Sequence, residues 1–177
     1  MNSITTRQAV LADIDALVTL FDEYRQFYGC TSDTKAAHAF PVDRFAHGES
    51  ILFLAFQANE PIGFTQLYPN FSSISLGRTF VLNDLFVHSS GRNKGVGTRL
   101  LHAASEYAKA IGAIRLSLST ATSNVTAQSL YQATCWQRDR NVSINFMPMS
   151  LPFRANPTLN PAPFSRWTLC DKAAQSR

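Results

Sequence analysis

The sequence predicts a single-domain α+β fold: a mixed, mostly antiparallel β-sheet with helices on both faces, in three α/β layers. Three observations lead to this prediction. Strand-like apolar runs follow one another between residues 51 and 88, two longer segments carry apolar residues at helical spacing, and a strand–helix–strand–helix order follows. A strand meander that leads into alternating strands and helices is typical of a sheet covered on both sides.

The N-terminal part predicts one strand and one long helix. Ile4, Thr6 and Val10 stand at even spacing, which favours a strand over residues 4–10. Asp13 has the chemistry of a helix N-cap and Gly29 that of a helix end. The helix between them has one broad apolar face, made of Leu17, Val18, Leu20, Phe21, Tyr24 and Tyr28. Residues 30–50 are polar and mixed, so we expect a loop there with a short helix near Val42 to His47.

Three strands are expected next. The continuous apolar run from Ile51 to Phe56 suits a strand covered on both faces. Asn59-Glu60-Pro61 is turn chemistry, so Gly63 to Tyr68 completes a hairpin. Arg78 to His88 is the third strand, rich in Phe, Val and Leu around the polar pair Asn83-Asp84.

The remaining elements alternate. A helix is expected from Gly97 to Ile111, ended by Gly112. Ile114 to Ser119 alternates strictly, which indicates a half-buried strand. A further helix over residues 126–134 and a last strand over residues 141–147 complete the domain.

The prediction therefore divides the chain into a domain of residues 1–147 and an irregular, proline-rich tail of residues 148–177. Five prolines fall within sixteen residues of this tail: Pro148, Pro152, Pro157, Pro161 and Pro163. Proline is unfavourable in helix interiors and in central strands, so we expect no regular structure there.

Composition limits the function classes. The chain has no apolar run near the roughly 20 residues of a membrane helix and no secretory leader pattern, so we expect a cytoplasmic protein without membrane contact. Its three cysteines are widely spaced and suggest neither a disulfide framework nor a metal site. Residues 1–137 hold ten basic and ten acidic residues, whereas residues 138–177 hold six and two. The net charge of +4 thus belongs to the tail, and we do not expect nucleic-acid binding.

The sharpest motif is a loop between a strand and a helix. Leu85-Phe86-Val87 leads through a polar break into Arg92-Asn93-Lys94-Gly95-Val96-Gly97-Thr98. Glycine lets the backbone approach a ligand closely, and the free amides at a helix start favour anions. With the cations Arg92 and Lys94, the segment predicts a pyrophosphate site. A P-loop sequence is absent, and Gly95-Val96-Gly97 lacks the third glycine of a dinucleotide fingerprint.

Two motifs in order carry a family resemblance. Arg92-x-x-Gly95-x-Gly97 resembles the R/Q-x-x-G-x-G/A acetyl-CoA motif of the GNAT superfamily of N-acetyltransferases. Asn124-x-x-Ala127-x-x-Leu130-Tyr131, followed by Cys135-Trp136, is similar to the second motif of that family. The resemblance extends from about Ile4 to Trp136 and implies a GNAT-like fold that uses acetyl-CoA without a metal.

Two positions depart from the family pattern. Asn93 stands where the family usually has glycine, and asparagine tolerates left-handed backbone comparatively well. Cys135 also replaces a usual glycine. Cysteine is strained there if the position requires a positive φ.

The resemblance implies direct attack of a primary amine on the thioester in a ternary complex. Tyr131 matches the general acid that protonates the leaving thiolate. The backbone of Leu85, Phe86 and Val87 would pair with pantetheine, and Asn124 would either bind pantetheine or cap its own helix.

The general base is left open between two neighbours. Related enzymes carry an acidic pair on this strand, but here the first position is Asn83 and only Asp84 is acidic. Because adjacent strand residues point to opposite faces, Asp84 is not expected to substitute for a carboxylate at position 83. Either Asp84 faces the cleft or Asn83 positions a water. A structural role for Asp84, such as pairing with an arginine, is an equal alternative.

Acidic and aromatic side chains predict the amine site. They lie on the first helix and on the loop after the strand that ends near Tyr68: Asp22, Glu23, Tyr24, Arg25, Tyr28, Tyr68 and Phe71. Carboxylates with aromatic walls suit a cationic amine, although an ordinary solvated helix face is equally compatible. We therefore predict transfer to a small cationic amine. The alternatives are a protein lysine or N-terminal amine, an aminoglycoside, and a non-catalytic acyl-CoA-binding module. A homodimer contact is expected at the strand over residues 141–147.

Overall fold

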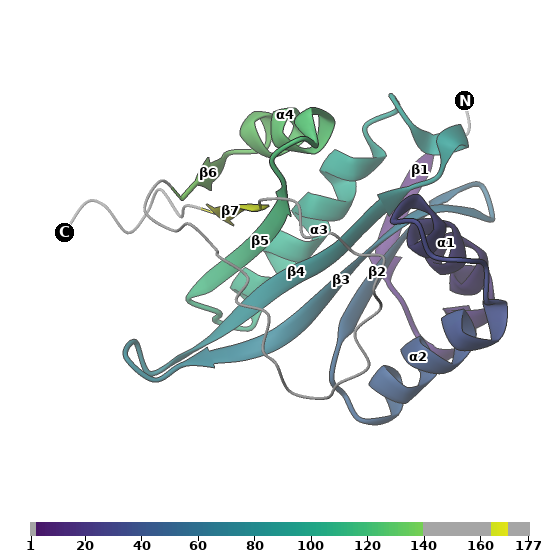
Figure 1. Cartoon of the computed structure of the whole chain (residues 1–177). Helices are drawn as coiled ribbons and strands as arrows, with labels where there is room; N and C mark the ends of the chain where they lie inside the picture. Colours follow the sequence, from purple (N-terminus) through teal and green to yellow (C-terminus); the bar gives the residue numbers. More distant parts are fainter. Residues whose placement is uncertain (1–2, 140–163, 170–177) are drawn as a thin grey trace. The chain divides into compact units, whose positions relative to one another are not determined.

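The computed structural model describes residues 3–139 and 164–169, and the chain divides into two compact units, residues 1–116 and 117–177 (Figure 1). The expected strand over residues 141–147 and the expected domain boundary at residues 147–148 lie outside the described residues.

The first unit contains a four-stranded antiparallel sheet. Its strands are β1 (Ile4–Gln8), β2 (Ile51–Gln57), β3 (Glu60–Ser72) and β4 (Gly77–Val87), and they neighbour one another in that order. On the side of their shared turn, β3 continues past the predicted end at Tyr68 to Ser72 and β4 starts one residue before the predicted Arg78, so the two strands form a long hairpin (Figure 1). The extension follows from backbone pairing, which continues out to Ser72 and Gly77 although the side chains of Phe71 and Arg78 in this part are exposed.

Helices cover both faces of this sheet. α1 (Ile14–Phe27) and α2 (Thr34–Ala46) lie on one face and α3 (Val96–Ala110) on the other (Figure 1). Ring contacts mark the two faces, because Phe64 of β3 meets Phe21 of α1 at 5.7 Å whereas Phe80 of β4 meets Tyr107 of α3 at 6.0 Å. The predicted α+β class, with mostly antiparallel strands and helices on both faces, is confirmed.

α2 corrects a prediction, since it occupies most of the segment expected to be a loop. It starts at residue 34 because Asp33 caps it, accepting a hydrogen bond from the amide of Ala36 at 2.9 Å. Pro41 lies inside the helix and is buried together with Ala37, one turn earlier. The proline and the weak amphipathic pattern hide this helix from sequence analysis, whereas packing of its small apolar side stabilises it.

The second unit begins within β5 (Arg115–Ala121) and continues with α4 (Val125–Ala133), β6 (Trp136–Arg138) and β7 (Phe164–Leu169). β7 pairs antiparallel with β5 on one side and with β6 on the other. The tail predicted to be irregular therefore contains a strand. β7 starts directly after the last proline, and its alternate residues Ser165 and Trp167 are buried.

Candidate functional site

The loop predicted to bind phosphate joins β4 to α3. It starts with a short 3-10 turn at Ser89–Gly91, and Gly91 packs so closely on β3 that a side chain would meet the carbonyl oxygen of Ile62 at 3.1 Å. Asn93 and Gly95 then take positive φ values of 59° and 75°. This left-handed backbone explains why asparagine and glycine stand at these positions.

The start of α3 leaves donors available for a ligand. Gly95 is the N-cap, no side chain caps the helix, and the helical bonding in this turn begins at Arg99 N, which donates to Gly95 O. The amides of Val96, Gly97 and Thr98 precede that bond. Open space surrounds the position that a Cβ of Gly95 would occupy. The loop therefore fits a pyrophosphate group, which binds to helix-start amides.

Two cations of the motif are held in place beside these amides. Arg92 donates through Nε to the carbonyl of Val87 at 3.2 Å, and Lys94 donates through Nζ to Oε1 of Gln57 at 3.1 Å. Both side chains remain exposed. Their attachment to β4 and β2 keeps two positive charges near the helix start, where they favour an anion.

A β-bulge decides which way the polar pair on β4 points. Gln66 of β3 is opposite Asp84 and Leu67 is opposite Leu82, so Asn83 is an extra residue. Before the bulge Phe80 reaches α3, and after it Asp84 reaches Tyr24 on α1. The expectation that residues 83 and 84 point apart is wrong, because Asn83 Nδ2 donates to Asp84 Oδ1 at 3.1 Å.

The carboxylate of Asp84 is the centre of a polar cluster on the α1 face. Asp84 is only 7% exposed, and Tyr24 Oη also donates to its Oδ1, at 2.8 Å. Burial raises the pKa of this carboxyl, and the hydrogen bonds from Tyr24 and Asn83 oppose that rise only in part. The described residues give it these polar partners and no arginine, so the pairing with an arginine is not found there.

Two further tyrosines surround Asp84. Tyr28 follows Tyr24 by one helical turn, with ring centroids 5.1 Å apart, and it is 47% exposed. Burial raises the pKa of Tyr24 and Tyr28, and the charge of Asp84 adds to the rise in both. On β3, burial and then the charge of Asp84 raise the pKa of Tyr68 to about 12. The structure thus brings together four predicted side chains around Asp84: Asn83, Tyr24, Tyr28 and Tyr68.

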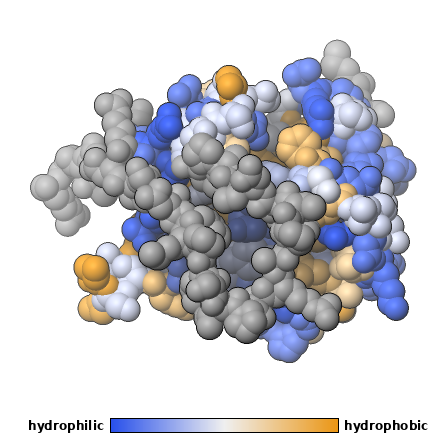
Figure 2. All heavy atoms as spheres, in the orientation of Figure 1, coloured by the Kyte–Doolittle hydropathy of each residue, from blue (hydrophilic) through white to orange (hydrophobic). Residues whose placement is uncertain are grey.

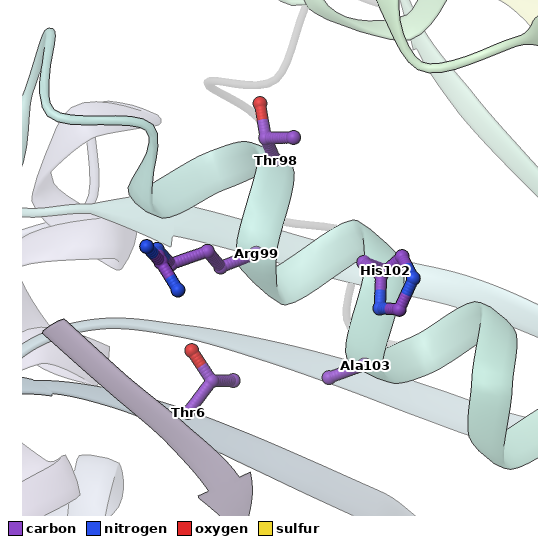
Figure 3. Close-up of a pocket in the computed structure, with 5 residues that line it drawn as sticks. All are labelled: Thr6, Thr98, Arg99, His102 and Ala103. Carbon is purple, nitrogen blue, oxygen red and sulfur yellow. The ribbon is translucent and has the colours of Figure 1, made fainter.

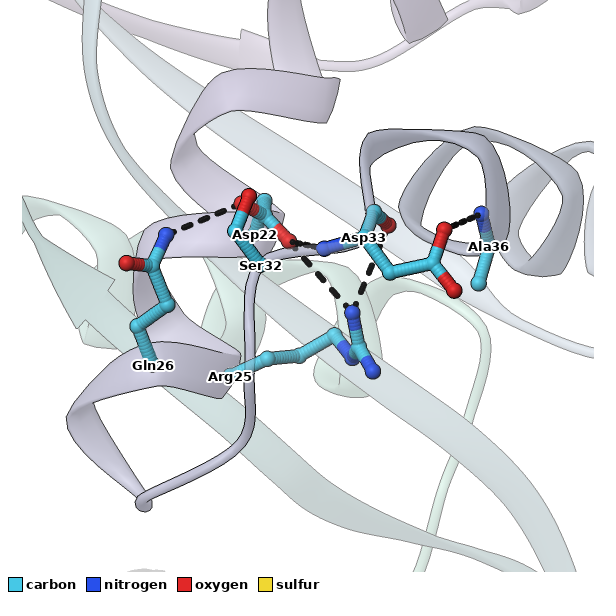
Figure 4. Close-up of polar contacts among 6 residues, drawn as sticks. All are labelled: Asp22, Arg25, Gln26, Ser32, Asp33 and Ala36. Atoms are coloured by element: carbon cyan, nitrogen blue, oxygen red, sulfur yellow. Dashed lines mark hydrogen bonds and ion pairs between the residues drawn. The ribbon is translucent and has the colours of Figure 1, made fainter.

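Asp22 and Arg25 belong to a different set of contacts. Asp22 is 4% exposed and accepts from Ser32 Oγ at 2.7 Å and the Asp33 amide at 2.8 Å, and it also accepts from Gln26 and Arg25 (Figure 4). The hydrogen bond from Ser32 is the main cause that lowers its pKa. These bonds fasten the connection between α1 and α2, so the structure does not place Asp22 and Arg25 with the Asp84 cluster.

Phe71 lies further out on the β3–β4 hairpin. It is five residues beyond Gln66, the partner of Asp84, which is about 16 Å along an extended strand. Its side chain is 67% exposed and stacks under Arg78 at 5.1 Å. Figure 2 shows apolar side chains at the hairpin tip, where Ile74 and Leu76 are almost fully exposed.

The second motif lies in the second unit. Asn124 is the N-cap of α4 and accepts from the amide of Ala127 at 3.1 Å, so the capping role is confirmed. Tyr131 is 5% exposed, and its ring lies 5.8 Å from that of Trp167. Cys135 has a φ of 65°. This position therefore does require the positive φ that suits the glycine usual in the family, and cysteine is strained there.

Two residues with polar contacts next to the site, His88 and Thr65, were not predicted from the sequence. His88 accepts through Nδ1 from the Ser90 amide at 3.3 Å, and its Nε2 lies 3.8 Å from Oε1 of Glu23 on α1. Thr65 Oγ1 donates to the backbone carbonyl of Asp84 at 2.8 Å. Neither has a sequence signal, because both depend on which strand residues become neighbours.

A separate hollow of about 370 Å³ lies between β1 and α3. It is lined by Thr6 on one side and by Thr98, Arg99, His102 and Ala103 on the other (Figure 3). The Asp84 cluster is on the other face of the sheet, so this hollow is distinct from it. Within the described residues, no cluster of side chains that could hold a metal ion occurs and no helix is long and apolar enough to cross a membrane.

The glycine loop lies between β4 and the start of α3, and the buried carboxylate of Asp84 lies on the same strand β4. The profile of the Acetyltransferase (GNAT) family matches residues 17–135. The chain belongs to this family and is an acetyl-transfer enzyme. GNAT enzymes use acetyl-CoA as their acetyl donor.

Individual relatives agree with the family. The chain is 47% identical over 133 residues to "Uncharacterized N-acetyltransferase YhfO" of Bacillus subtilis, covering 75% of this chain and 89% of that protein. It is 34% identical over 96 residues to a "Probable acetyltransferase" of Haemophilus influenzae, covering 54% of this chain and 66% of that protein.

Solved structures agree as well. The crystal structure of "a probable acetyltransferase" is 36% identical, has a TM-score of 0.77, and is matched over 83% of this chain and 99% of that chain. An aminoglycoside N-acetyltransferase in complex with CoA is 19% identical with a TM-score of 0.67, over 79% and 91% of the two chains, and shows the shared fold.

Proposed function

We propose that this enzyme transfers the acetyl group of acetyl-CoA to the primary amine of a small cationic molecule by direct attack in a ternary complex. The observation that supports it best is Asp84, a carboxylate with a raised pKa on the strand that leads into the glycine loop. A carboxylate whose pKa is raised by burial is suited to accept a proton from an amine near neutral pH.

The cofactor side of the proposal uses the loop and the two motifs. The amides of Val96, Gly97 and Thr98, with Arg92 and Lys94, would hold the pyrophosphate, while Asn93 and Gly95 provide the left-handed turn. By resemblance to the family, the backbone of Leu85, Phe86 and Val87 would hold pantetheine, while the side-chain oxygen of Asn124 caps α4. Tyr131 would protonate the departing thiolate.

The amine side of the proposal uses the cluster around Asp84. Tyr24, Tyr28 and Tyr68 supply aromatic walls, and Asp84 supplies the negative charge that attracts an ammonium group. Asp22 and Arg25 support this site indirectly, since they fasten the connection that follows α1. We keep Phe71 as a candidate only for long substrates that extend along the hairpin.

The test combines calorimetry and thiol release. The full chain is titrated with acetyl-CoA and then assayed against polyamines, lysine peptides and aminoglycosides. Turnover with polyamines that drops sharply in Tyr131→Phe supports the proposal, and turnover only with peptides or aminoglycosides replaces its substrate class. Binding without turnover on any amine would favour a non-catalytic acyl-CoA-binding module. No binding would contradict the role of the glycine loop.

A further inference from the structure

Asp84 needs a route for its proton. It is 7% exposed, so a carboxyl that takes a proton from the amine cannot pass it directly to bulk water while substrate covers the site. The general base must return to its charged form before the next cycle. The neighbours of Asp84 therefore decide how the enzyme resets.

A chain of hydroxyls runs from Asp84 to the surface. Tyr24 Oη is 2.8 Å from Asp84 Oδ1, and Tyr24 is partly buried. Tyr28, one turn later at the C-cap of α1, is 47% exposed. Burial is the main cause of the raised pKa of both phenols. The hydrogen bond between the two side chains adds to the rise in the pKa of Tyr24 and opposes the rise in that of Tyr28. Exposure thus increases from the carboxyl through one phenol to the next.

We propose that Tyr24 and Tyr28 form a proton relay that carries the proton of Asp84 to solvent, an inference that rests on the proposed acetyl transfer. An N–H bond of the amine breaks as an O–H bond forms on Asp84. The carboxyl then donates to Tyr24 Oη, the original Tyr24 proton passes to Tyr28 Oη, and the original Tyr28 proton passes to water. Both phenols end neutral and Asp84 ends as a carboxylate.

Other groups near Asp84 do not offer the same path. Asn83 donates to the carboxylate, but an amide is a poor proton carrier. Tyr68, on β3, is influenced by the charges of Asp84, Arg44 and Glu49, and the contacts of the described residues give it no hydrogen bond to the carboxyl. Of the three tyrosines, Tyr24 alone joins Asp84 directly.

The experiment compares hydroxyl removal at three tyrosines while the rings are kept. Tyr24→Phe and Tyr28→Phe are measured against Tyr107→Phe, whose ring packs against Phe53 and Phe80 on the opposite face. We expect kcat to fall about 10- to 100-fold in Tyr24→Phe and about 3- to 10-fold in Tyr28→Phe, with the Kd for acetyl-CoA unchanged. Tyr107→Phe should keep the wild-type kcat.

A relay has a signature that a packing role lacks. Raising the concentration of a small buffer base such as imidazole should restore kcat in Tyr28→Phe, because the buffer replaces the exit group, and should leave Tyr107→Phe unchanged. The solvent deuterium isotope effect on kcat should be larger in Tyr28→Phe than in wild type. If Tyr28→Phe turns over as fast as wild type and its kcat does not change with buffer concentration, the relay is overturned and acetyl transfer still stands. No turnover by the wild type with any amine would overturn both.

Discussion

Asp22 and Asp84 are two buried carboxylates on the same side of the sheet that behave in opposite ways. They are 4% and 7% exposed, yet the pKa of Asp22 is lowered and that of Asp84 is raised. Asp22 accepts four hydrogen bonds divided between its two oxygens, whereas both hydrogen bonds to Asp84 fall on Oδ1. Burial disfavours the charged form of both carboxylates. The larger number of hydrogen-bond donors around Asp22 stabilises its charged form, so its pKa is lowered, whereas the pKa of Asp84 is raised.

The difference separates a structural acid from a reactive one. Ser32, Asp33, Gln26 and Arg25 stabilise the ionised form of Asp22, so this group gains little by taking a proton. Asp84 is less well satisfied and takes a proton more readily. We therefore expect the carboxylate with fewer hydrogen-bond donors, Asp84, to be the reactive one.

The largest expected effect comes from Asp84→Asn. The amide oxygen can keep both hydrogen bonds at the Oδ1 position, so the fold should be retained while the base is lost. We expect kcat to fall about 100- to 10,000-fold with little change in the Kd for acetyl-CoA, measured by thiol release and calorimetry. Asp15→Asn on α1 is the control, because the Asp15 side chain is 91% exposed. A variant at position 84 with wild-type kcat would show that Asp84 is not the base.

Asp22→Asn should instead act on stability. An amide at this position faces two donors whichever way it is turned, since Ser32 and Gln26 donate to one oxygen and Arg25 and Asp33 to the other. Unsatisfied buried donors are costly, and we expect the free energy of unfolding to fall by about 3 kcal/mol in urea titrations. A loss as small as that of Asp15→Asn would mean that the connection after α1 does not depend on this carboxylate.

The smallest effect is a pair of opposite pH dependences. The pKa of Asp84 is raised on folding, so wild type loses stability from this group as the pH rises from about 3.9, the usual value in unfolded chains, through the folded pKa. The pKa of Asp22 is lowered, so its contribution is present above about 3.9 and is lost as the pH falls through the folded pKa.

Urea unfolding at several pH values tests this contrast. Relative to wild type, Asp84→Asn should gain stability towards neutral pH and should lose that advantage in acid. The deficit of Asp22→Asn should be greatest near neutral pH and should shrink in acid. Two variants whose differences from wild type change with pH in the same direction would remove the contrast between the carboxylates.

Several parts of the fold and site follow from local sequence. The helical spacing behind Asp13 and the apolar runs at residues 51–56 and 78–88 correspond to α1, β2 and β4, because period and burial are fixed by nearest neighbours along the chain. The tolerance of Asn93 for left-handed backbone also follows from its residue type, and its φ is 59°.

Other parts required the folded chain. α2 was hidden by Pro41, and β7 by the prolines that precede it. β7 is stabilised by pairing with β5 and β6, which are distant in sequence. Backbone pairing between distant segments leaves no pattern in the local sequence. The nearby prolines therefore led to the prediction of irregular structure where β7 forms.

By itself, the sequence determined the family, the α+β class and the position of the glycine loop, since each depends on residue types at short, fixed spacing. Only the tertiary structure decided which acidic residue is poised for chemistry. One extra residue at Asn83 turns Asp84 towards Tyr24, while Asp22 turns to its own loop. The physical reason is that ionisation depends on burial and on the donors that surround each carboxylate, and folding alone brings those donors together.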